Sequence, residues 1–392
     1  MRLQISRSMF FRAKRPRVLL QLFLLLAAFL LLALYSIKGL GSQLTPPHFL
    51  KVTDQPLCRK SDIGVDQPLM RVMVAFFPVS ESNYLIQIKW CFRSLLEMLK
   101  SQPPLWRTDV ILYVQNTTAK DLLELGCSTQ PRKDKEEPFK CILVQYTRVK
   151  DRPVRLLLST EYEQDLVEQL KEFPSADSIV PLAEQSEHFI QYDVVIRSDL
   201  DVFFTPAFAT WVPGRCEFVS GSGGYSTSFN VQKLAAVARY NNIPFDSTIW
   251  DIGSTWVTSG PLAAKVILLY GAQLAVNEVM NAAPLNRKTL NGRRETYIYV
   301  KAKLDIQSSS TLEYEKAGVL HIHTFQDGEY FSKFRFVEGK YAGNDTLLPP
   351  SLNATQGRVC DYAAYIARQS QLISLPELGK QLRNVKSGHL LV

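Results

Sequence analysis

The sequence has little histidine and lacks several short motifs that mark large classes of protein. Only five of its 392 residues are histidine. It has no Cys-x-x-Cys motif, and the spacing of its six cysteines does not suggest zinc binding. Neither a Gly-x-Gly-x-x-Gly fingerprint nor a Gly-Lys-Ser phosphate loop is present, and there is no internal repeat. These absences argue against a zinc-binding module and against the commonest phosphate-binding loops.

Most of the chain also lacks a strong charge of either sign. The formal net charge is +8, but six cationic side chains and no acidic one occur before residue 18. The other 375 residues therefore carry a net charge of only about +2. Nucleic-acid binding, which relies on a basic surface, gains no support from this distribution.

The N-terminal part contains one long apolar run. Residues 18–37 have only Gln21 and Ser36 as polar side chains. At ~1.5 Å per residue, a helix of this length spans about 30 Å of hydrocarbon. Because the cationic residues precede the run, we predict a cytoplasmic tail at 1–17, a transmembrane signal anchor at 18–37 and a lumenal remainder. A cleaved signal peptide is the alternative, although its apolar region is usually shorter, about 7–15 residues.

The cysteines and the glycosylation signals all follow this apolar run. An oxidising lumen would allow disulfides among them. We expect Cys127 to pair with Cys141, because these residues flank a short polar loop that closes with little rearrangement of the backbone. Asn-x-Thr sequons begin at Asn116, Asn344 and Asn353. Both features agree with a lumenal domain.

The residues after the anchor divide into three parts. Residues 38–70 contain glycines, prolines and scattered polar residues, which is typical of a stem. Residues 71–345 alternate apolar runs with amphipathic segments, which predicts an α/β domain with a mostly parallel central sheet flanked by helices. Residues 346–392 are expected to form a C-terminal helical extension and a tail.

The predicted elements of the domain begin with strand and helix in alternation. Strands are expected at 71–77, 108–114 and 141–146, and helices at 84–99, 119–125 and 162–173. A further helix at 178–190 precedes an apolar strand at 194–204.

This last strand carries Asp199 and Asp201. Side chains at i and i+2 lie on the same side of an extended backbone, so both carboxylates can reach one cation. Hard divalent cations such as Mg²⁺ and Mn²⁺ prefer oxygen ligands. Sites in open α/β sheets also lie at the carboxyl ends of strands. The pair therefore predicts a Mn²⁺ or Mg²⁺ site that also receives the phosphates of a substrate.

A second group of candidate residues occurs near the end of the domain. His321 and His323 alternate in a strand-like run at 319–325, which places both imidazoles on one face. Imidazole can complete the coordination of a metal held by carboxylates, and Lys333 can meet diphosphate oxygens. Two buried core histidines and a solvated basic turn are the structural alternative.

Three further features have both a functional and a structural interpretation. Glycines at 221–224 let a backbone pass close to a ligand or form an ordinary turn. Asp251 lies in a run at 249–256 that lines a cleft or forms a core strand. Glu278, on a helix predicted at 263–281, is either a base or a solvated residue.

The anchor, the stem, the α/β pattern and the Asp-Leu-Asp at 199–201 resemble Golgi glycosyltransferases of the GT-A fold. The segment from His321 through Gly328 to Lys333 is similar to the late His-x-x-Gly-x-x-Lys motif of the family-eight-like retaining members. Four residues separate His323 from Gly328 here, and four more precede Lys333. Which histidine binds the metal therefore stays open. The blocks at 198–203, 253–256 and 331–334 also resemble a eukaryotic branch of nucleotide-diphospho-sugar transferases.

This resemblance implies a single-pass type II protein of the Golgi membrane that transfers a sugar from a nucleotide-diphosphate donor to a glycan, protein or lipid acceptor. It implies that Asp199 and Asp201 hold Mn²⁺ or Mg²⁺ and that His321 or His323 adds a ligand. Gly328 and Lys333 would contact the donor. Asp251 and Glu278 are the candidates for a catalytic base if the reaction inverts the sugar, whereas a retaining reaction has no need of one.

Two other classes of function share parts of this pattern. Some phosphatases use the first aspartate of an Asp-x-Asp motif to attack phosphorus, but they usually carry it on their first strand, whereas several strands precede Asp199 here. A relative that keeps the fold and binds a glycan without turnover is the other alternative. Metal-dependent turnover of a sugar nucleotide separates the transferase from the binder, and release of phosphate from simple esters identifies the phosphatase.

Overall fold

The computed structural model describes residues 64–78, 82–130, 139–148, 151, 176–178, 180–214, 216–222, 232, 235–236, 238–239, 252–268, 298–324, 331–341 and 357–385. All of them belong to one compact unit of the chain, 56–152 and 170–392. Within these ranges no helix is both long and apolar enough to cross a bilayer. The anchor at 18–37 and the helix at 162–173 lie outside the described residues and stay predictions.

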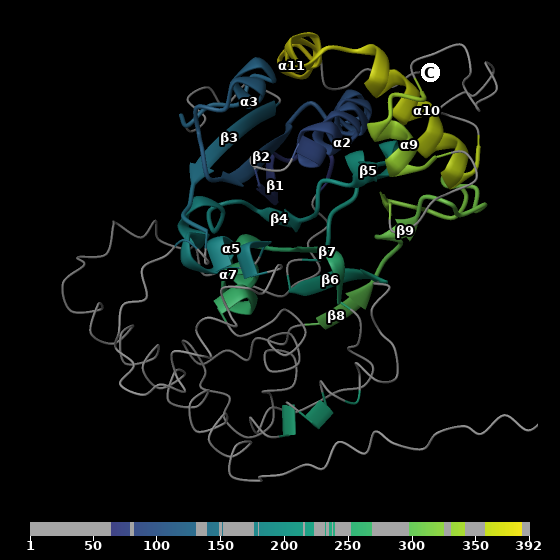
Figure 1. Cartoon of the computed structure of the whole chain (residues 1–392). Coiled ribbons are helices and arrows are strands. Elements are labelled where there is room, and N and C mark those ends of the chain that lie inside the picture. Colours follow the sequence, from purple (N-terminus) through teal and green to yellow (C-terminus); the bar gives the residue numbers. More distant parts are fainter. Residues whose placement is uncertain are drawn as a thin grey trace, which may run out of the picture. The chain divides into compact units, whose positions relative to one another are not determined.

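The centre of the described unit is a seven-stranded mixed sheet in the order β3-β2-β1-β4-β7-β6-β8 (Figure 1). Its strands are β1 (Leu69–Phe77), β2 (Trp106–Val114), β3 (Phe139–Gln145), β4 (Val194–Arg197), β6 (Glu217–Ser222), β7 (Ile252–Thr258) and β8 (Ile298–Lys301). The neighbours β3, β2, β1 and β4 are parallel, whereas β7 runs antiparallel to both β4 and β6. The α/β class is confirmed, and the sheet is mixed: β6 and β8 are again parallel, so within this sheet β7 alone runs against its neighbours.

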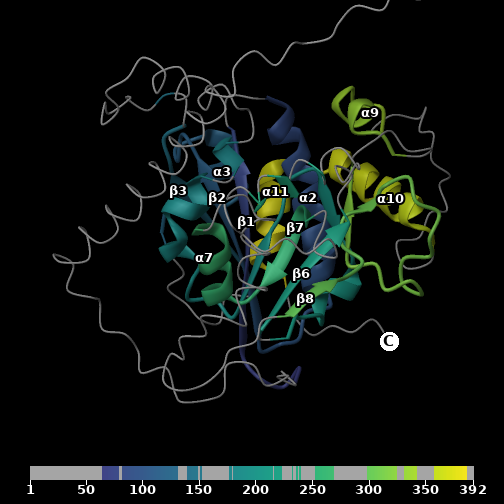
Figure 2. The same cartoon turned by 90° about the horizontal axis from the view of Figure 1, so that it is seen from below.

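Helices cover both faces of this sheet because its central strands are apolar on both faces. In β1, Met73 and Ala75 face one core, and Val72 and Val74 face the other. Helices α2 (Ser82–Lys100), α10 (Val359–Leu372) and α11 (Leu375–Arg383) cover the first core, and α5 (Val180–Glu184) and α7 (Gly260–Leu268) cover the second. Figure 1 shows α2 and α11 above the strands and α5 and α7 below them, and Figure 2 shows α2, α7 and α11 from below.

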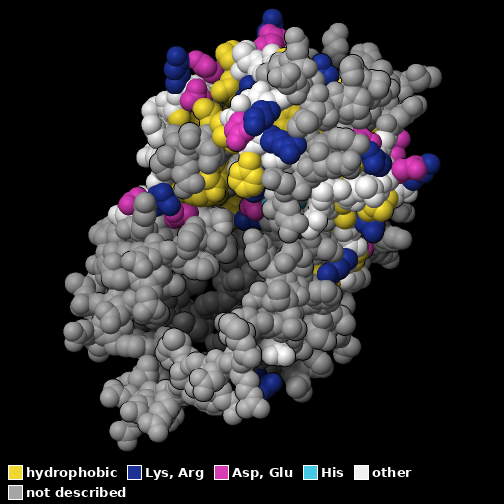
Figure 3. All heavy atoms as spheres, turned by 45° about the vertical axis from the view of Figure 1, so that its right-hand side comes forward, with side chains coloured by type: hydrophobic (Ala, Val, Ile, Leu, Met, Phe, Trp, Pro, Cys, Tyr) yellow, Lys and Arg dark blue, Asp and Glu magenta, His cyan; other side chains and the backbone are white. Residues whose placement is uncertain are grey.

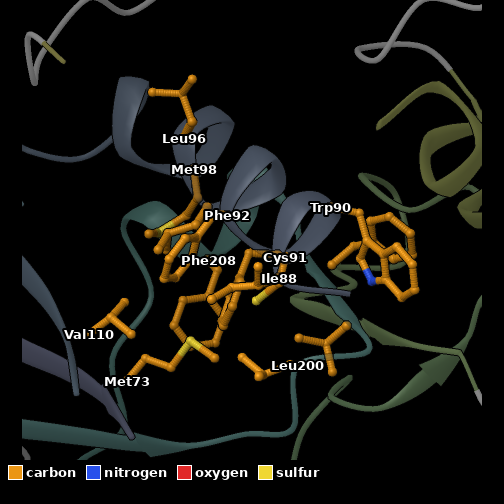
Figure 4. Packing of buried hydrophobic residues seen from close by; sticks show 14 of the residues in the cluster. Met73, Ile88, Trp90, Cys91, Phe92, Leu96, Met98, Val110, Leu200 and Phe208 are labelled. Carbon is orange, nitrogen blue, oxygen red and sulfur yellow. The ribbon is translucent and has the colours of Figure 1, made fainter. Parts of the chain in front are cut away.

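Helix α2 supplies much of the first core. Its buried side chains recur at the spacing that predicted a helix, and they include Ile88, Cys91, Phe92, Leu95 and Leu99. Figure 4 shows Phe92 and Ile88 of α2 in one cluster with Met73 of β1 and with Leu200. Burying one such side chain contributes about 1.5–3 kcal/mol. Because Leu200 stands between Asp199 and Asp201, this core anchors the segment that carries the two aspartates.

A second, three-stranded sheet has the order β5-β10-β9 and consists of β5 (Val202–Phe204), β10 (His321–His323) and β9 (Ile306–Gln307). The prediction of one strand at 194–204 is therefore wrong. Strand β4 belongs to the first sheet and β5 to the second, and residues 198–201 connect them. The polar residues Ser198, Asp199 and Asp201 explain the break, because carboxylates do not continue a strand that is buried on both faces.

The free edge of β5 is covered by side chains from two helices. The Phe204 N–H donates a hydrogen bond to Ser94 Oγ of α2 over 3.0 Å. The Tyr362 hydroxyl of α10 donates to the Phe204 carbonyl oxygen over 2.7 Å. Unpaired backbone groups at a buried edge would be costly, so these two bonds hold β5 against the helices.

The helices differ most from their predicted bounds in two places. Residues 178–190 are not one helix but three short pieces, the 3-10 turns η2 (Ala176–Ser178) and η3 (Ser186–His188) with α5 between them. Pro181 contributes to this division, because it has no N–H to continue a helix from the preceding turn. The predicted C-terminal tail contains a second helix, α11, whose N-cap Ser374 accepts a hydrogen bond from Glu377 N–H. The other short helices are α3 (Lys120–Glu124), η4 (Pro206–Ala209) and α9 (Lys333–Val337).

The predicted disulfide between Cys127 and Cys141 is confirmed. Cys216 is also disulfide-bonded, whereas Cys91 and Cys360 are buried free thiols. The disulfide joins Cys127, which follows α3 closely, to Cys141 of β3, the strand that pairs in parallel with β2. It therefore fastens the outer strand of the sheet.

Charged side chains of both signs are interspersed on the surface. Figure 3 shows Lys and Arg side chains lying among Asp and Glu on one face of the described part. Ion pairs such as Lys100 with Glu97 and Lys120 with Glu124 are of this kind. Exposed pairs contribute only about 0–1 kcal/mol each, so the stability of the unit comes mainly from the two apolar cores.

Candidate metal centre

The pairing of β5 with β10 brings two distant parts of the chain together at the carboxyl end of β4. The strands are antiparallel, with His323 opposite Val202, so Asp201 lies beside the residue that follows β10. That residue, Thr324, donates to the Asp201 carbonyl oxygen from its N–H over 3.0 Å and from its hydroxyl over 2.8 Å. These bonds fix the backbone that carries Asp201.

Three side chains at this point could hold one metal ion. A carboxylate oxygen of Asp199, one of Asp201 and a ring nitrogen of His323 all lie within 4.8 Å of one another. Ligand atoms this close can share an ion, because metal–ligand distances are about 2.0–2.4 Å. Two carboxylates with one imidazole suit Mn²⁺ and are also compatible with Mg²⁺. The residues present therefore fit the metal that the sequence predicted.

Lys333 joins these three residues from the first position of α9. Its Nζ lies 3.3 Å from Asp201 Oδ2, and its side chain is partly exposed. The N-cap Ser332 accepts a hydrogen bond from Arg335 N–H and so fixes the start of α9. We call Asp199, Asp201, His323 and Lys333 the outer cluster.

Asp199 is the most open member of the outer cluster. Its side chain is 38 % exposed, whereas that of Asp201 is 16 % exposed. Asp199 Oδ1 lies 3.0 Å from a guanidinium nitrogen of Arg197, the last residue of β4. A ligand approaching from solvent would therefore meet Asp199 more readily than Asp201.

The charges of the outer cluster shift two pKa values in opposite directions. Burial alone would raise the pKa of Asp201, but hydrogen bonds and charge interactions with His323 and Lys333 outweigh it and lower that pKa. Burial alone would lower the pKa of His323, but Asp201, Asp305 and Asp199 outweigh it and raise that pKa. Without a metal, these contacts therefore shift Asp201 toward its ionised form and His323 toward its protonated form.

A second group of polar side chains lies directly behind the outer cluster. We call Ser198, Thr255, Asp305 and His321 the inner cluster. The side chains of Asp305 and His321 have no exposed surface, and Asp305 Oδ1 lies 3.2 Å from His321 Nδ1. The other ring nitrogen of His321 lies 3.1 Å from Ser198 Oγ and 3.4 Å from Thr255 Oγ1. Both nitrogens of His321 thus have partners inside the protein.

The two histidines lie on one face of β10, as their alternation predicted, but they differ in surroundings. Asp305 Oδ1 lies 3.2 Å from Nδ1 of His321 and 3.8 Å from Nδ1 of His323. His323 Nε2 in turn lies 3.0 Å from Asp201 Oδ1. The structure thus brings His323, rather than His321, beside the two aspartates.

Several predicted site residues lie outside the described part of the chain. They are Gly328, Asp251 and Glu278, and their roles stay predictions. Asp305 is the functional candidate that the sequence interpretation missed. It is a single acid between the apolar residues Leu304 and Ile306, and an acid in such a run signals a buried carboxylate that requires a partner.

The fold and the site define an α/β protein with a carboxylate and imidazole centre at the carboxyl end of a central strand. Residues 66–266 and 263–391 match the family described as "Domain of unknown function (DUF7164)", and the chain belongs to this family. No curated protein matches the sequence.

Solved structures with some similarity to the chain include several glycosyltransferases. The galactosyltransferase LgtC, with donor and acceptor sugar analogues, is 11 % identical with a TM-score of 0.36, covering 69 % of this chain and 94 % of its own. Mouse xyloside xylosyltransferase 1 is 13 % identical with a TM-score of 0.35, covering 66 % and 98 %. The bifunctional glycosyltransferase WbbM is 11 % identical with a TM-score of 0.40, covering 81 % and 52 %. Values this low assign neither a substrate nor a reaction to this chain.

Proposed function

We propose that the chain is a metal-dependent glycosyltransferase that moves a sugar from a nucleotide-diphosphate donor to a hydroxyl group of a glycan, protein or lipid acceptor. The observation that carries this proposal is the outer cluster. Two aspartates and a histidine within reach of one ion stand beside a lysine, at the carboxyl end of a central strand. This combination suits a diphosphate, which brings negative charge that both an ion and a lysine can neutralise.

Each residue of the outer cluster has a distinct task in this proposal. Asp199, Asp201 and His323 would hold Mn²⁺ or Mg²⁺, which acts as a Lewis acid on the diphosphate when bound. Lys333 lies beside Asp201 and would meet the negative charge that develops on the departing diphosphate. Asp199, as the most exposed ligand, would lie nearest to the incoming donor.

We also propose that the protein works as a single-pass type II protein in the lumen of the Golgi. The cationic tail and the apolar run at 18–37 support this orientation. The Cys127–Cys141 disulfide supports an oxidising compartment, where disulfides persist. Asn116 is exposed on the loop after β2 and so is accessible to glycosylation.

The test is an assay of the full-length chain in detergent with a panel of sugar nucleotides, in Mn²⁺ or in EDTA. We expect one donor to release its nucleotide diphosphate only with metal, and Asp199→Ala and Asp201→Ala to abolish the release. Asp193→Ala is the matched control, because Asp193 is exposed at the opposite end of β4, where it accepts a hydrogen bond from Met70 N–H.

Other outcomes of this assay identify the alternatives. Binding of Mn²⁺ and a sugar nucleotide without release of any product would indicate a non-catalytic binder. Release of inorganic phosphate from simple esters, dependent on Asp199, would indicate a phosphatase instead.

A further inference from the structure

Asp305 occupies an unusual place in the described part of the chain. Its side chain has no exposed surface, and its backbone has a φ of +54°, the one positive φ of a non-glycine residue among the described residues. Such a conformation is uncommon, although aspartate tolerates it better than most residues do. A buried carboxylate on a disfavoured backbone is costly, so its contacts must outweigh that cost.

The protein makes room for this carboxylate with a glycine on the neighbouring strand. A Cβ at Gly221 of β6 would lie 2.6 Å from the Leu304 carbonyl oxygen and 2.9 Å from Asp305 Oδ2. Any side chain there would push Asp305 out of place. The glycines at 221–224 were predicted to approach a ligand or to form a turn. Gly221 instead lies close to Leu304 and Asp305 inside the protein.

The two oxygens of Asp305 face different partners. Oδ2 accepts a hydrogen bond from Thr255 N–H of β7 over 3.0 Å. Oδ1 faces His321 Nδ1 at 3.2 Å and His323 Nδ1 at 3.8 Å. The distance to His323 is longer than a hydrogen bond, but at that separation a carboxylate charge still favours a proton on the nitrogen that faces it. Asp201 favours a proton on Nε2 in the same way while no ion is present, so the contact with Asp305 decides the position of the proton once an ion occupies Asp201. The contacts of Asp305 lower its own pKa, although burial alone would raise it.

The orientation of His323 gives this contact a consequence for the metal. A neutral imidazole carries its proton on one nitrogen and a lone pair on the other. With a proton on Nδ1, which faces Asp305, the lone pair of His323 lies on Nε2, which faces Asp201. A carboxylate behind a metal-binding histidine has this orienting effect in many metal sites.

We propose that Asp305 is a positioning residue that keeps the proton of His323 on Nδ1 and so presents Nε2 to the ion held by Asp199 and Asp201. His321 links the same carboxylate to Ser198, the residue before Asp199, and so holds the aspartate segment in register with β10. This inference rests on the metal site of the proposed function, but it requires no sugar transfer.

The test compares the full-length wild type with Asp305→Asn and measures Mn²⁺ binding by electron paramagnetic resonance. Loss of an orienting carboxylate typically weakens metal binding about 10- to 100-fold, and we expect an effect of that size. The matched control is Asp109→Asn. Asp109 is a buried carboxylate of β2 that accepts a hydrogen bond from the Tyr192 hydroxyl over 2.7 Å, remote from the outer cluster along the sheet order. We expect this control to bind Mn²⁺ with wild-type affinity.

A spectroscopic measurement keeps the inference testable even if Asp305→Asn does not fold. Selective ¹⁵N labelling of the five histidines gives few signals, and His323→Gln identifies that of His323. With diamagnetic Mg²⁺ at a pH where the ring is neutral, we expect the wild-type His323 signals to report a protonated Nδ1 and an unprotonated Nε2. A protonated Nε2 would overturn the inference.

The remaining outcomes separate this inference from the proposed function. Mn²⁺ affinity that is unchanged in Asp305→Asn would overturn the positioning role, even if the wild type transfers sugar. Weakened Mn²⁺ binding in Asp305→Asn, with no transfer by the wild type from any donor, would support the positioning role and count against the proposed transferase. A wild type that binds no Mn²⁺ would overturn the positioning role, whereas transfer without metal would still support a transferase.

Discussion

The outer and inner clusters lie side by side but differ in how exposed their side chains are and in whether those side chains are available to a ligand. In the outer cluster, Asp199 and Lys333 are partly exposed, and three ligand atoms lie within reach of one ion. In the inner cluster, Asp305 and His321 are fully buried and contact each other. His321 and His323 are two residues apart on one strand, yet they belong to different clusters. The burial of a side chain and its contacts, rather than its residue type, distinguish a side chain that is available to an ion from one that is occupied inside the protein.

The largest expected effect is on the outer cluster. Asp201→Asn keeps the size of the side chain but removes the charge that an ion requires, so we expect nucleotide-diphosphate release to fall by at least ~10³-fold. The assay is release from the preferred donor at saturating Mn²⁺. The control Asp193→Asn should retain wild-type activity, and retention of activity by Asp201→Asn would show that the pair does not hold the catalytic ion.

The inner cluster should respond in stability instead. His321→Ala leaves the buried Asp305 carboxylate without a main partner, and an unsatisfied buried polar group costs about 1–3 kcal/mol, more when it is charged. We therefore expect a large fall in the free energy of unfolding, measured by urea denaturation monitored by fluorescence. His323→Ala should cost less stability but more Mn²⁺ affinity. Equal losses of stability in the two variants would contradict the division into two clusters.

A smaller effect is expected from the lysine of the outer cluster. Lys333→Met removes the charge proposed to meet the departing diphosphate, and loss of one such group typically lowers kcat by about 10²-fold. Mn²⁺ binding in the absence of donor should not weaken, because Lys333 is not a metal ligand. Lys340→Met is the matched control, since Lys340 is an exposed residue just after α9 that pairs with Glu338. If both variants behave alike, Lys333 has no role in the reaction.

The smallest effect is a dependence on pH that has opposite signs for stability and for metal binding. The pKa of His323 is raised in the folded protein above its usual value of about 6.5. Its protonation therefore stabilises the metal-free protein fully below pH ~6.5, and this contribution is lost as the pH rises through the raised pKa. Mn²⁺ requires the unprotonated ring, so its affinity should rise over the same range, by at most about tenfold per pH unit.

Isothermal titration calorimetry with Mn²⁺ and urea denaturation, each across pH 5.5–9, check this expectation. The difference in stability between the wild type and His323→Gln should shrink as the pH rises. The Mn²⁺ affinity of His323→Gln should show a weaker dependence on pH than that of the wild type. A wild-type affinity that falls with rising pH would contradict the assignment of His323 as a ligand.

The first half of the sheet could be predicted because its signals are local. Strands β1, β2 and β3 are apolar runs, and α2 has apolar residues at helical spacing, so each element is specified by its own residues. Helix α11 also has a local signal that was misinterpreted. This part of the chain was predicted as a tail, but a serine followed two residues later by proline, as at Ser374 and Pro376, is typical of the start of a helix.

The candidate site could be predicted only in part because its contacts join distant residues. The alternation of His321 and His323 correctly placed both on one face, but the choice between them depends on the pairing of β10 with β5, which spans more than a hundred residues. Asp305 depends on Thr255 and on the glycine at 221, and neither is near it in sequence. A single acid among apolar neighbours indicates that a partner exists but not which one.

The hydrogen bond from Tyr362 to Phe204 also bears on how the protein is made. The two residues are 158 positions apart, and Phe204 belongs to the short strand that directly follows Asp201. During translation, the ribosome must therefore synthesise Tyr362 before the carbonyl group at the outer edge of this strand can receive its hydrogen bond. We infer that nascent chains halted between these residues retain an open strand edge, and that chaperones in the compartment of synthesis would find it there.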